Sequence, residues 1–360
     1  MSGINRRDFI AGAGAAIGGT AFPVRAEPAS GLWTPRADMP FAVQEIYPAA
    51  FWKTVPDAAS AKPRSLGVLV NAGGITGGGP GLIGVSGAVT VYDPVGDRWS
   101  HGPLLPEPRH HIALVFASGF LFALGGFSAD RDGAWRMRAD LWRIDSLDEA
   151  SWRPRAPLPV PQAESVAASL DGFIHVAGGR SPAMSRNREW SDHIDTEKHF
   201  AYDPREDRWS ERRPLPTARN SAAGAVVDGF LYVLGGRTVS GGNLPDCHVY
   251  DGFADRWQPI APIPKSAQAG APRGQAGNAA AVWNGKIYMM GGEWFSGDGG
   301  VYADVFEYDP RTDKWRAVAP MPRPRHGLGA VALADGIYVC GGASGPSASG
   351  TTPFLDRFEI

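Results

Sequence analysis

The sequence predicts an all-β fold, a six-bladed β-propeller, on three observations. Six Gly-Gly pairs recur along the chain at intervals of 52, 53, 57, 56 and 50 residues. Tight-turn pairs such as Asp228-Gly229 precede most of the glycine pairs, and a tyrosine with a tryptophan seven residues later follows in most copies. A period of this length indicates one supersecondary unit copied along the chain. Four short strands in each copy would make one propeller blade.

Each copy is expected to contain antiparallel strands a, b, c and d. Asp-Gly or Asn-Gly between two apolar runs is typical of a two-residue hairpin, because both turn residues need positive φ. In the fourth copy the apolar runs 225–227 and 230–234 flank such a pair and predict strands a and b. Strands c and d are marked by Tyr92/Trp99, Tyr202/Trp209, Tyr250/Trp257 and Tyr308/Trp315, with Ile144 and Trp152 in the looser second copy.

The two ends of the chain predict how the ring closes. A proline lies seven residues after the tryptophan in each copy, and Trp33/Pro40 repeats this spacing with no strands before it. The last residues, 356–360, align with the start of a strand c at 304–308. The sixth blade therefore lacks strand d, and we expect the N-terminal strand to complete it, which removes two exposed sheet edges. The predicted blades are 41–99, 108–152, 162–209, 219–257, 273–315 and 325–360 plus 31–36.

This pattern resembles the kelch family, whose repeat has the double glycine, the later Tyr and Trp, and this period. The resemblance covers the chain after about residue 31. It implies that the glycines serve the crowded end of strand b and that the tryptophans fill space between blades.

Residues 1–26 are predicted to be a twin-arginine signal peptide. Asn5-Arg6-Arg7-Asp8-Phe9-Ile10 resembles the export motif, and Val24-Arg25-Ala26 resembles a cleavage site. The apolar stretch between them is too short and glycine-rich for a good membrane span. We expect the twin-arginine machinery to export the protein, and residues 27–360 to form a periplasmic or secreted propeller without a membrane span.

Composition narrows the classes of partner. The chain has 360 residues with 47 Gly and 31 Pro, which suits short strands and turns. A net charge of −2 predicts no general attraction to nucleic acid. The two cysteines, Cys247 and Cys340, fall in blades that are not neighbours and are expected to be free thiols.

Function is expected on the face that carries the b–c loops and the links between blades, because variable loops on a rigid scaffold commonly hold binding sites. Sixteen residues before the glycine pairs lies a ring of polar residues, placed at the start of strand a; the first-blade counterpart is within 44–47. Arginine binds carboxylates bidentately, so a small anionic or polyhydroxylated ligand is predicted. Structural hydrogen bonding by each arginine is the alternative. The predicted ligand-binding residues are Arg109, Glu164, Arg180, Arg219, Asn220, Arg273, Gln275, Arg325 and Trp294.

Glu293 is the candidate catalytic residue. Gly291-Gly292-Glu293 resembles the bacterial periplasmic sialic acid mutarotases, kelch enzymes with a Glu in this setting. The resemblance implies an acid–base isomerase of a sugar acid, with His111 or His326 as second proton carrier. The family's Arg in the same loop is missing from 296–303. Arg273 or Arg325 is the predicted replacement, and we expect no metal or cofactor.

Two alternatives remain open. Loops 127–139 and 180–197 are rich in Arg and Trp and would suit a non-catalytic module that binds a protein partner. More distantly, the chain is similar to the central domain of galactose oxidase, which implies a copper-dependent carbohydrate oxidase. Against that reading, His110 and His111 are adjacent on a strand and are expected to point to opposite sides.

Overall fold

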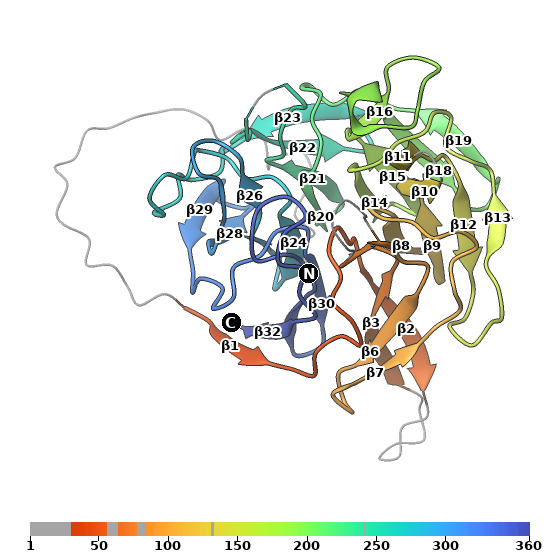
Figure 1. The fold of residues 1–360 in the computed structure, drawn as a ribbon, viewed down its shortest axis with the longest axis horizontal. Coiled ribbons are helices and arrows are strands. Elements are labelled where there is room, and N and C mark those ends of the chain that lie inside the picture. Colours follow the sequence, from red (N-terminus) through yellow and green to blue (C-terminus); the bar gives the residue numbers. More distant parts are fainter. Residues whose placement is uncertain (1–29, 56–63, 78–83, 131–132, 241) are drawn as a thin grey trace, which may run out of the picture.

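A computed structural model describes residues 30–55, 64–77, 84–130, 133–240 and 242–360. Six four-stranded antiparallel sheets surround a central axis, with the innermost strands next to it (Figure 1). The fold is therefore the predicted six-bladed β-propeller. The predicted signal peptide, 1–26, lies outside the described residues.

The blades follow chain order, each from its inner strand outward. Blade 1 has β2 (Ala49–Val55), β3 (Arg64–Ala72), β6 (Val89–Asp93) and β7 (Arg98–His101). Blade 2 has β8 (Ala113–Ala117), β9 (Phe120–Leu124), β12 (Leu141–Ile144) and β13 (Arg153–Arg155). Blade 3 has β14 (Val166–Leu170), β15 (Phe173–Ala177), β18 (His199–Asp203) and β19 (Arg208–Glu211).

The remaining blades repeat this order. Blade 4 has β20 (Ala223–Val227), β21 (Phe230–Leu234), β22 (Cys247–Asp251) and β23 (Arg256–Ile260). Blade 5 has β24 (Ala279–Trp283), β25 (Lys286–Met290), β28 (Val305–Asp309) and β29 (Lys314–Ala317). Blade 6 has β30 (Gly329–Leu333), β31 (Gly336–Cys340), β32 (Leu355–Glu359) and β1 (Leu32–Pro35).

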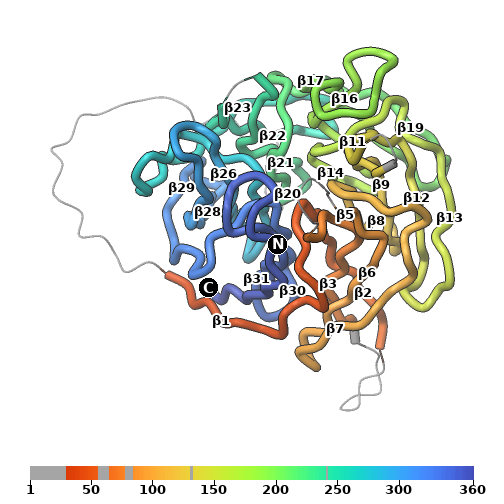
Figure 2. The backbone as a smooth tube through the Cα atoms, viewed as in Figure 1, coloured from red at the N-terminus to blue at the C-terminus, as the bar shows by residue number. Residues whose placement is uncertain are grey.

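The N-terminal strand closes the ring, as predicted. β1 pairs antiparallel with β32, with Trp33 opposite Phe358, so the last blade has its fourth strand from the start of the chain. In Figure 2 the first described residues lie alongside the C-terminal strands. This pairing supplies the outer edge of β32 with a partner.

The tryptophans join neighbouring blades. Each donates its indole N–H to a carbonyl oxygen of the adjacent blade or of the chain that leads to it, as Trp257 does to Arg213 at 2.8 Å. The same bond is made by Trp33, Trp99, Trp152, Trp209 and Trp315. Apolar clusters also cross from blade to blade, for example from Val70 to Trp142. Neighbouring blades therefore share their cores.

The repeated tyrosines fix the c–d turns. Tyr308 donates its hydroxyl hydrogen to Asp313 at 2.7 Å, and Asp313 also accepts the backbone N–H of Ala261 in the preceding blade. The same arrangement occurs at Tyr92/Asp97, Tyr202/Asp207 and Tyr250/Asp255. These turns lie on the face opposite the b–c loops, and their recurrence shows that they serve the fold.

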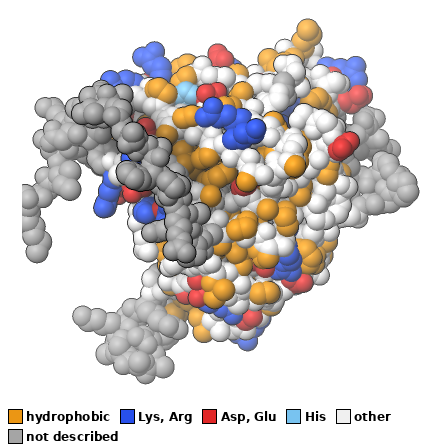
Figure 3. All heavy atoms as spheres, turned by 90° about the vertical axis from the view of Figure 1, so that its left-hand side faces the viewer, with side chains coloured by type: hydrophobic (Ala, Val, Ile, Leu, Met, Phe, Trp, Pro, Cys, Tyr) orange, Lys and Arg blue, Asp and Glu red, His pale blue; other side chains and the backbone are white. Residues whose placement is uncertain are grey.

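Short hairpins extend the b–c loops on the other face. They are β4/β5 (Ile75–Thr76, Gly84–Val85), β10/β11 (Phe127–Asp130, Gly133–Met137), β16/β17 (Arg180–Pro182, His193–Asp195) and β26/β27 (Glu293–Trp294, Gly300–Val301), with a 3-10 turn at Trp190–Asp192. From the side, basic and acidic side chains are interspersed (Figure 3), which agrees with the small net charge. Within the described residues, none of the helical segments reaches the length and apolarity that a membrane crossing requires.

Candidate functional site

A cavity of about 400 Å³ opens at the mouth of the central channel, on the face of the b–c loops. Its polar walls include Glu45, His111, Glu164, Asn220, Arg237 and Glu293, and its aromatic walls are Trp135, Trp190 and Phe295. Below it, a narrower space of about 100 Å³ is lined mainly by small residues at the starts of the inner strands. The mouth pocket is thus the place where side chains from different blades converge.

In a first set, one residue in each blade, shortly before the inner strand, has a left-handed backbone conformation, and three of these residues line the pocket. The six are Glu45, His111, Glu164, Ser221, Gly277 and Gly327, with φ between 52° and 65°. Backbone hydrogen bonds link them from blade to blade, such as His111 N–H to Glu45 O and Glu45 N–H to Gly327 O. This conformation costs a non-glycine residue roughly 1 kcal/mol or more. Four blades nevertheless keep a side chain there, and a Cβ on Gly327 would lie 2.9 Å from the Glu45 Cδ.

The second set is the residue after each Gly-Gly pair. Each forms an isolated antiparallel β-bridge with the residue that directly precedes the left-handed position. Arg237 pairs in this way with Asn220, and Glu293 pairs with Ala276. The other members are Ile75, Phe127, Arg180 and Ala343. These positions repeat in backbone geometry, but apart from Arg180 and Arg237 they differ in residue type, so the chemistry of the wall varies around the ring.

Glu293 and Arg237 form the central ion pair of the wall. Arg237 Nη1 donates to Glu293 Oε1 at 2.6 Å, and the backbone N–H of Ser347 donates to Glu293 Oε2 at 2.7 Å. Although burial alone lowers the pKa of Arg237, the Glu293, Glu164 and Glu45 carboxylates together outweigh it and the pKa is raised. Arg237 also lies over the Phe295 ring, 5.1 Å from its centroid. The pair thus holds one carboxylate in a fixed orientation at the pocket.

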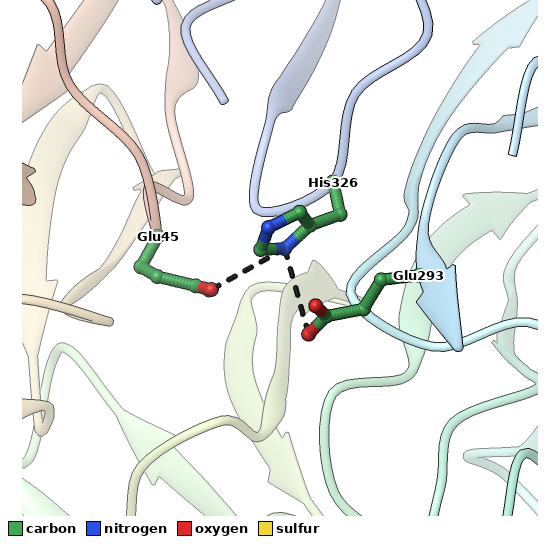
Figure 4. Close-up of side chains that lie close together, drawn as sticks. All are labelled: Glu45, Glu293 and His326. Carbon is green, nitrogen blue, oxygen red and sulfur yellow. Dashed lines mark ion pairs between the residues drawn. The ribbon is translucent and has the colours of Figure 1, made fainter. Parts of the chain in front are cut away.

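His326 lies between two carboxylates. Its Nδ1 is 3.5 Å from Glu293 Oε1 and 3.6 Å from Glu45 Oε1 (Figure 4). His326 has no exposed surface, and among the described residues neither ring nitrogen has a hydrogen-bond partner. The side chain is therefore buried against the wall and directed at both acids.

The hydrogen bonds of His110 and His111 determine their protonation. His110 Nε2 contacts the carbonyl oxygen of Ala134 at 2.6 Å, so this nitrogen must carry hydrogen. Burial lowers the pKa of His110 to about 3, so the ring is neutral and its Nδ1 accepts. His111 Nδ1, at 2.6 Å, must then donate to it.

His111 is consequently an imidazolium. Its second nitrogen, Nε2, is 2.9 Å from Glu45 Oε2. Burial alone lowers the pKa of His111, but the Glu45 and Glu164 carboxylates outweigh it and raise the pKa. In return, although burial raises the pKa of Glu45, His111 holds it well below its ordinary value. The two side chains form a buried charged pair.

Glu164 and Arg180 build the third side of the wall. Glu164 Oε1 is 3.5 Å from Arg180 Nη1, and Glu164 Oε2 accepts the Ser221 hydroxyl hydrogen at 2.9 Å. Burial raises the pKa of Glu164, but His111 and Arg180 outweigh it, so the carboxylate is ionised. Arg180 donates to the Trp190 carbonyl oxygen and lies 4.1 Å from that ring's centroid. The aromatic rim is thereby tied to the charged wall.

The structure brings part of the predicted site together. Glu293, His111, Glu164 and Asn220 line the pocket. His326 and Arg180 are fully buried behind the wall and contact its carboxylates.

Three predicted ligand-binding arginines are placed elsewhere. Arg109, Arg219 and Arg325 are at most 1% exposed and do not line the pocket. Arg219 donates to the carbonyl oxygens of Thr217, Gly235 and Asp246. Arg109 bonds Glu107, Asp140 and Gly125 O, and Arg325 bonds Asp356, Arg323 O and Val339 O. Their placement supports the structural alternative, because the hydrogen bonds that they make go to groups of the blades themselves.

The other three predicted ligand residues also lie outside the pocket lining. Arg273 donates weakly to Ile263 O at 3.4 Å, Gln275 is buried, and Trp294 packs on Tyr302. One reason is a difference in register. The inner strands begin at Ala113, Val166, Ala223, Ala279 and Gly329, a few residues after the predicted starts. The residues of the polar ring therefore lie in the loops that lead into the inner strands, and not in the strands themselves.

The expected orientation of the adjacent histidines was also wrong. His110 and His111 approach each other through their Nδ1 atoms, because the φ of 52° at His111 breaks the alternation of an extended strand.

Two wall residues were missed as site residues. Glu45 lies within the 44–47 segment that matches the polar ring, and Arg237 follows a Gly-Gly pair as Glu293 does. Position in the repeat was therefore the available signal. No sequence spacing indicated that Arg237 and Glu293, in different blades, form an ion pair.

Both cysteines are free and buried, and burial raises the pKa of each thiol to about 12. Among the described residues, the side chains close enough to hold a metal ion are Glu45, Glu293 and His326. This set includes no tyrosine and no cysteine.

Comparisons with known proteins agree with the repeat pattern. A family model described as the KLHDC2/KLHL20/DRC7 Kelch-repeats domain matches residues 200–342. Kelch-like protein 35 of Mus musculus is 27% identical over 67% of this chain and 37% of its own length. Beta-scruin of Limulus polyphemus is 26% identical over 77% of this chain and 30% of its own length. The chain thus spans about a third of the length of these relatives.

A solved structure titled "Structure of YjhT" has the same fold. It superposes with a TM-score of 0.67, covering 89% of this chain and 95% of that one at 15% sequence identity. At this identity the likeness concerns the fold alone. The six Gly-Gly blades, the matching repeat model and the kelch relatives together identify the chain as a six-bladed β-propeller of kelch repeats.

Proposed function

We propose that the mouth pocket binds a sugar or sugar acid and catalyses its mutarotation by proton transfer, with Glu293 as the acid–base residue. The observation that supports this most directly is the buried Glu293 carboxylate, oriented by Arg237 and Ser347 at the wall of an aromatic-rimmed cavity. A cavity of about 400 Å³ is within the range of small-molecule sites. Aromatic side chains suit the apolar faces of a sugar ring, and charged side chains suit its hydroxyls.

The proposed proton transfers use a base, Glu293, and an acid, the His111 imidazolium. Glu293 takes the proton of the anomeric hydroxyl while the bond between the anomeric carbon and the ring oxygen breaks. The ring oxygen takes a proton from the His111 imidazolium, which leaves an open-chain carbonyl compound. Rotation about the carbon–carbon bond followed by the reverse transfers gives the other anomer. No atom or electron pair is gained or lost overall, and neither group needs to leave its place in the wall.

Arg237 supports a carboxylate-bearing substrate. Of the pocket-lining residues, it is the guanidinium that borders the cavity, and its side chain is 16% exposed. It therefore takes the place proposed from the sequence for Arg273 or Arg325. Resemblance to the sialic acid mutarotases, carried by Gly291-Gly292-Glu293, favours the same class of substrate.

Glu293→Gln tests this proposal. Glutamine keeps the shape and the acceptor oxygen of the side chain but is not a base. We expect the enzyme-catalysed interconversion of the two anomers of a sialic or uronic acid to slow at least 100-fold, a typical contribution of general acid–base catalysis. NMR measures the rate of this interconversion. Glu189→Gln, an exposed carboxylate on the same face, is the matched control. An unchanged rate in Glu293→Gln, with sugar bound by calorimetry, would exclude this residue's role.

A protein-interaction role is the second candidate, and one observation favours it. The 180–197 loop exposes Met184 at 82%, Ile194 at 53% and Trp190 at 42%. Large exposed apolar side chains are common in interfaces. A partner whose binding is lost in a Met184→Glu/Ile194→Glu variant but kept in Glu293→Gln would support this function over catalysis.

We also propose that residues 1–26 direct twin-arginine export to the periplasm. The Arg6-Arg7 pair supports this. Replacement of both by lysine should prevent appearance of a mature chain starting near Glu27, as measured by mass spectrometry of the periplasmic fraction.

A further inference from the structure

We propose that Glu45, Glu293 and His326 form a binding site for one divalent transition-metal ion, best suited to Zn²⁺, at the wall of the mouth pocket. One ligand atom from each residue lies within 4.8 Å of the others. In Figure 4 the two carboxylates approach the imidazole from different blades. The site goes beyond the proposed isomerisation and does not depend on it.

The separations match those around a shared ion. The contacts of His326 Nδ1 with Glu293 Oε1 and Glu45 Oε1, 3.5 and 3.6 Å, are longer than ordinary hydrogen bonds. Two tetrahedral zinc ligands, each about 2.0–2.2 Å from the metal, lie roughly 3.3–3.6 Å apart. A small movement of the Glu45 carboxylate would complete the third side of the triangle.

His326 gives independent support because its nitrogens have no hydrogen-bond partner in the described part of the chain. The ring is 0% exposed, and neither Nδ1 nor Nε2 is hydrogen-bonded to a described residue. Buried polar atoms without a partner are rare in folded proteins. A single ring nitrogen carries at most one hydrogen and so cannot bond to both carboxylates fully. An ion between them would contact all three groups at once.

The donor set indicates the kind of metal. One imidazole nitrogen and two carboxylate oxygens suit Zn²⁺, Co²⁺ or Mn²⁺, whereas Ca²⁺ and Mg²⁺ prefer oxygen ligands throughout. Three protein ligands leave a fourth position of a tetrahedron for water or a ligand oxygen. Glu45 and Glu293 both line the pocket, so that position is accessible from it.

Two neighbouring cationic side chains, Arg237 and His111, also bind the two carboxylates that would hold the metal ion. Arg237 Nη1 donates to Glu293 Oε1, the same oxygen that faces His326. His111 occupies the other oxygen of Glu45, Oε2, and leaves Oε1 available. Arg237 therefore competes with the metal for one carboxylate, and its removal should strengthen metal binding. A site produced by stray surface histidines would not respond in this way.

Calorimetry with ZnCl₂ tests the site, using chelator-treated full-length protein without a polyhistidine tag. We expect one ion per chain, with affinity reduced at least tenfold in His326→Gln and in Glu45→Gln, and increased several-fold in Arg237→Gln. His193→Gln is the matched control, because His193 is a buried histidine of the same face outside the cluster. Its affinity should equal that of the unchanged protein.

Co²⁺ gives a second readout that needs no turnover, since its visible absorption is intense only in tetrahedral sites. The absorption should appear with the unchanged protein and disappear in His326→Gln, with folding of each variant checked by circular dichroism. No saturable binding, or equal binding in His326→Gln and the unchanged protein, would overturn the proposal. Failure of the mutarotase assay would leave these results unaffected, so the two proposals fail separately.

Discussion

Arg219 and Arg237 belong to the same blade but serve different regions of the molecule. Arg219 is buried, and its hydrogen bonds go to three backbone carbonyl oxygens around the start of the blade. Arg237 borders the pocket and pairs with a carboxylate from the next blade. The first position is also arginine in blades 2 and 6 and is glutamine in blades 3 and 5, whereas the second is Ile, Phe, Arg, Arg, Glu and Ala in blades 1 to 6. Recurrence of a polar residue therefore indicates a role in the fold, and variation at a repeated position indicates the site.

The largest effect that would test this difference is expected from Arg219→Met. Methionine keeps much of the apolar volume but removes three hydrogen bonds from a charged donor, and the buried carbonyl oxygen of Gly235 loses its arginine partner. A hydrogen bond to a charged group contributes about 1.5–3 kcal/mol, so the free energy of unfolding should fall by about 3 kcal/mol or more. Chemical denaturation measures this change.

Ligand affinity of the folded Arg219→Met protein should be unchanged, because Arg219 does not reach the pocket. A variant with full stability but no sugar binding would reverse the assignment of the two arginines. It would return Arg219 to the ligand-binding role that the polar ring suggested.

The two histidine pairs give a second contrast. In blade 3, His199 Nδ1 is 3.1 Å from Arg213 O and must donate, so its Nε2 accepts from His175 Nδ1 at 2.9 Å. Both rings are therefore neutral, unlike His111 at the mouth. Burial lowers the pKa of His175 to about 3 and that of His199 to about 4.

Acid should consequently destabilise the fold through blade 3. In the unfolded chain both histidines titrate near pH 6.5, above their folded pKa values. Their contribution is complete above that pH and is lost as the pH falls, by about 2 kcal/mol per histidine at pH 5. Denaturation at pH 7 and 5 should show this loss, and a His175→Phe/His199→Leu variant should lose less on acidification. Equal acid sensitivity of the two proteins would mean that other groups are responsible.

The sequence was sufficient for the fold because its determinants are local and repeated. Gly-Gly pairs, Asp-Gly turns and the Tyr/Trp spacing each specify short-range geometry, and six copies make the pattern unambiguous. The strand-completing role of Leu32–Pro35 followed from counting strands. These features need no knowledge of contacts between distant residues.

The site was only partly predictable because it depends on contacts between blades and on backbone conformation. Glu293 stood out as the acid in a Gly-Gly-Glu sequence, but its partner Arg237 lies in another blade. The left-handed φ of His111 turned that side chain toward His110 and Glu45, against the alternation expected of a strand. The arginines at the ring position were predicted to bind the ligand. The sequence does not show that their N–H groups are already hydrogen-bonded to backbone carbonyl oxygens.

The smallest expected effect concerns the repeated tyrosines, and the informative result is an equal loss of stability in all four Tyr→Phe variants. Phenylalanine at Tyr92, Tyr202, Tyr250 or Tyr308 removes one hydroxyl bond to an aspartate that still accepts a backbone N–H from the neighbouring blade. Each loss should cost about 1–2 kcal/mol, similar in all four blades, without change in ligand binding. Denaturation midpoints of the four variants measure this. If one variant alone impaired binding, that turn would have a role in the site, and recurrence would no longer separate residues of the fold from residues of the pocket.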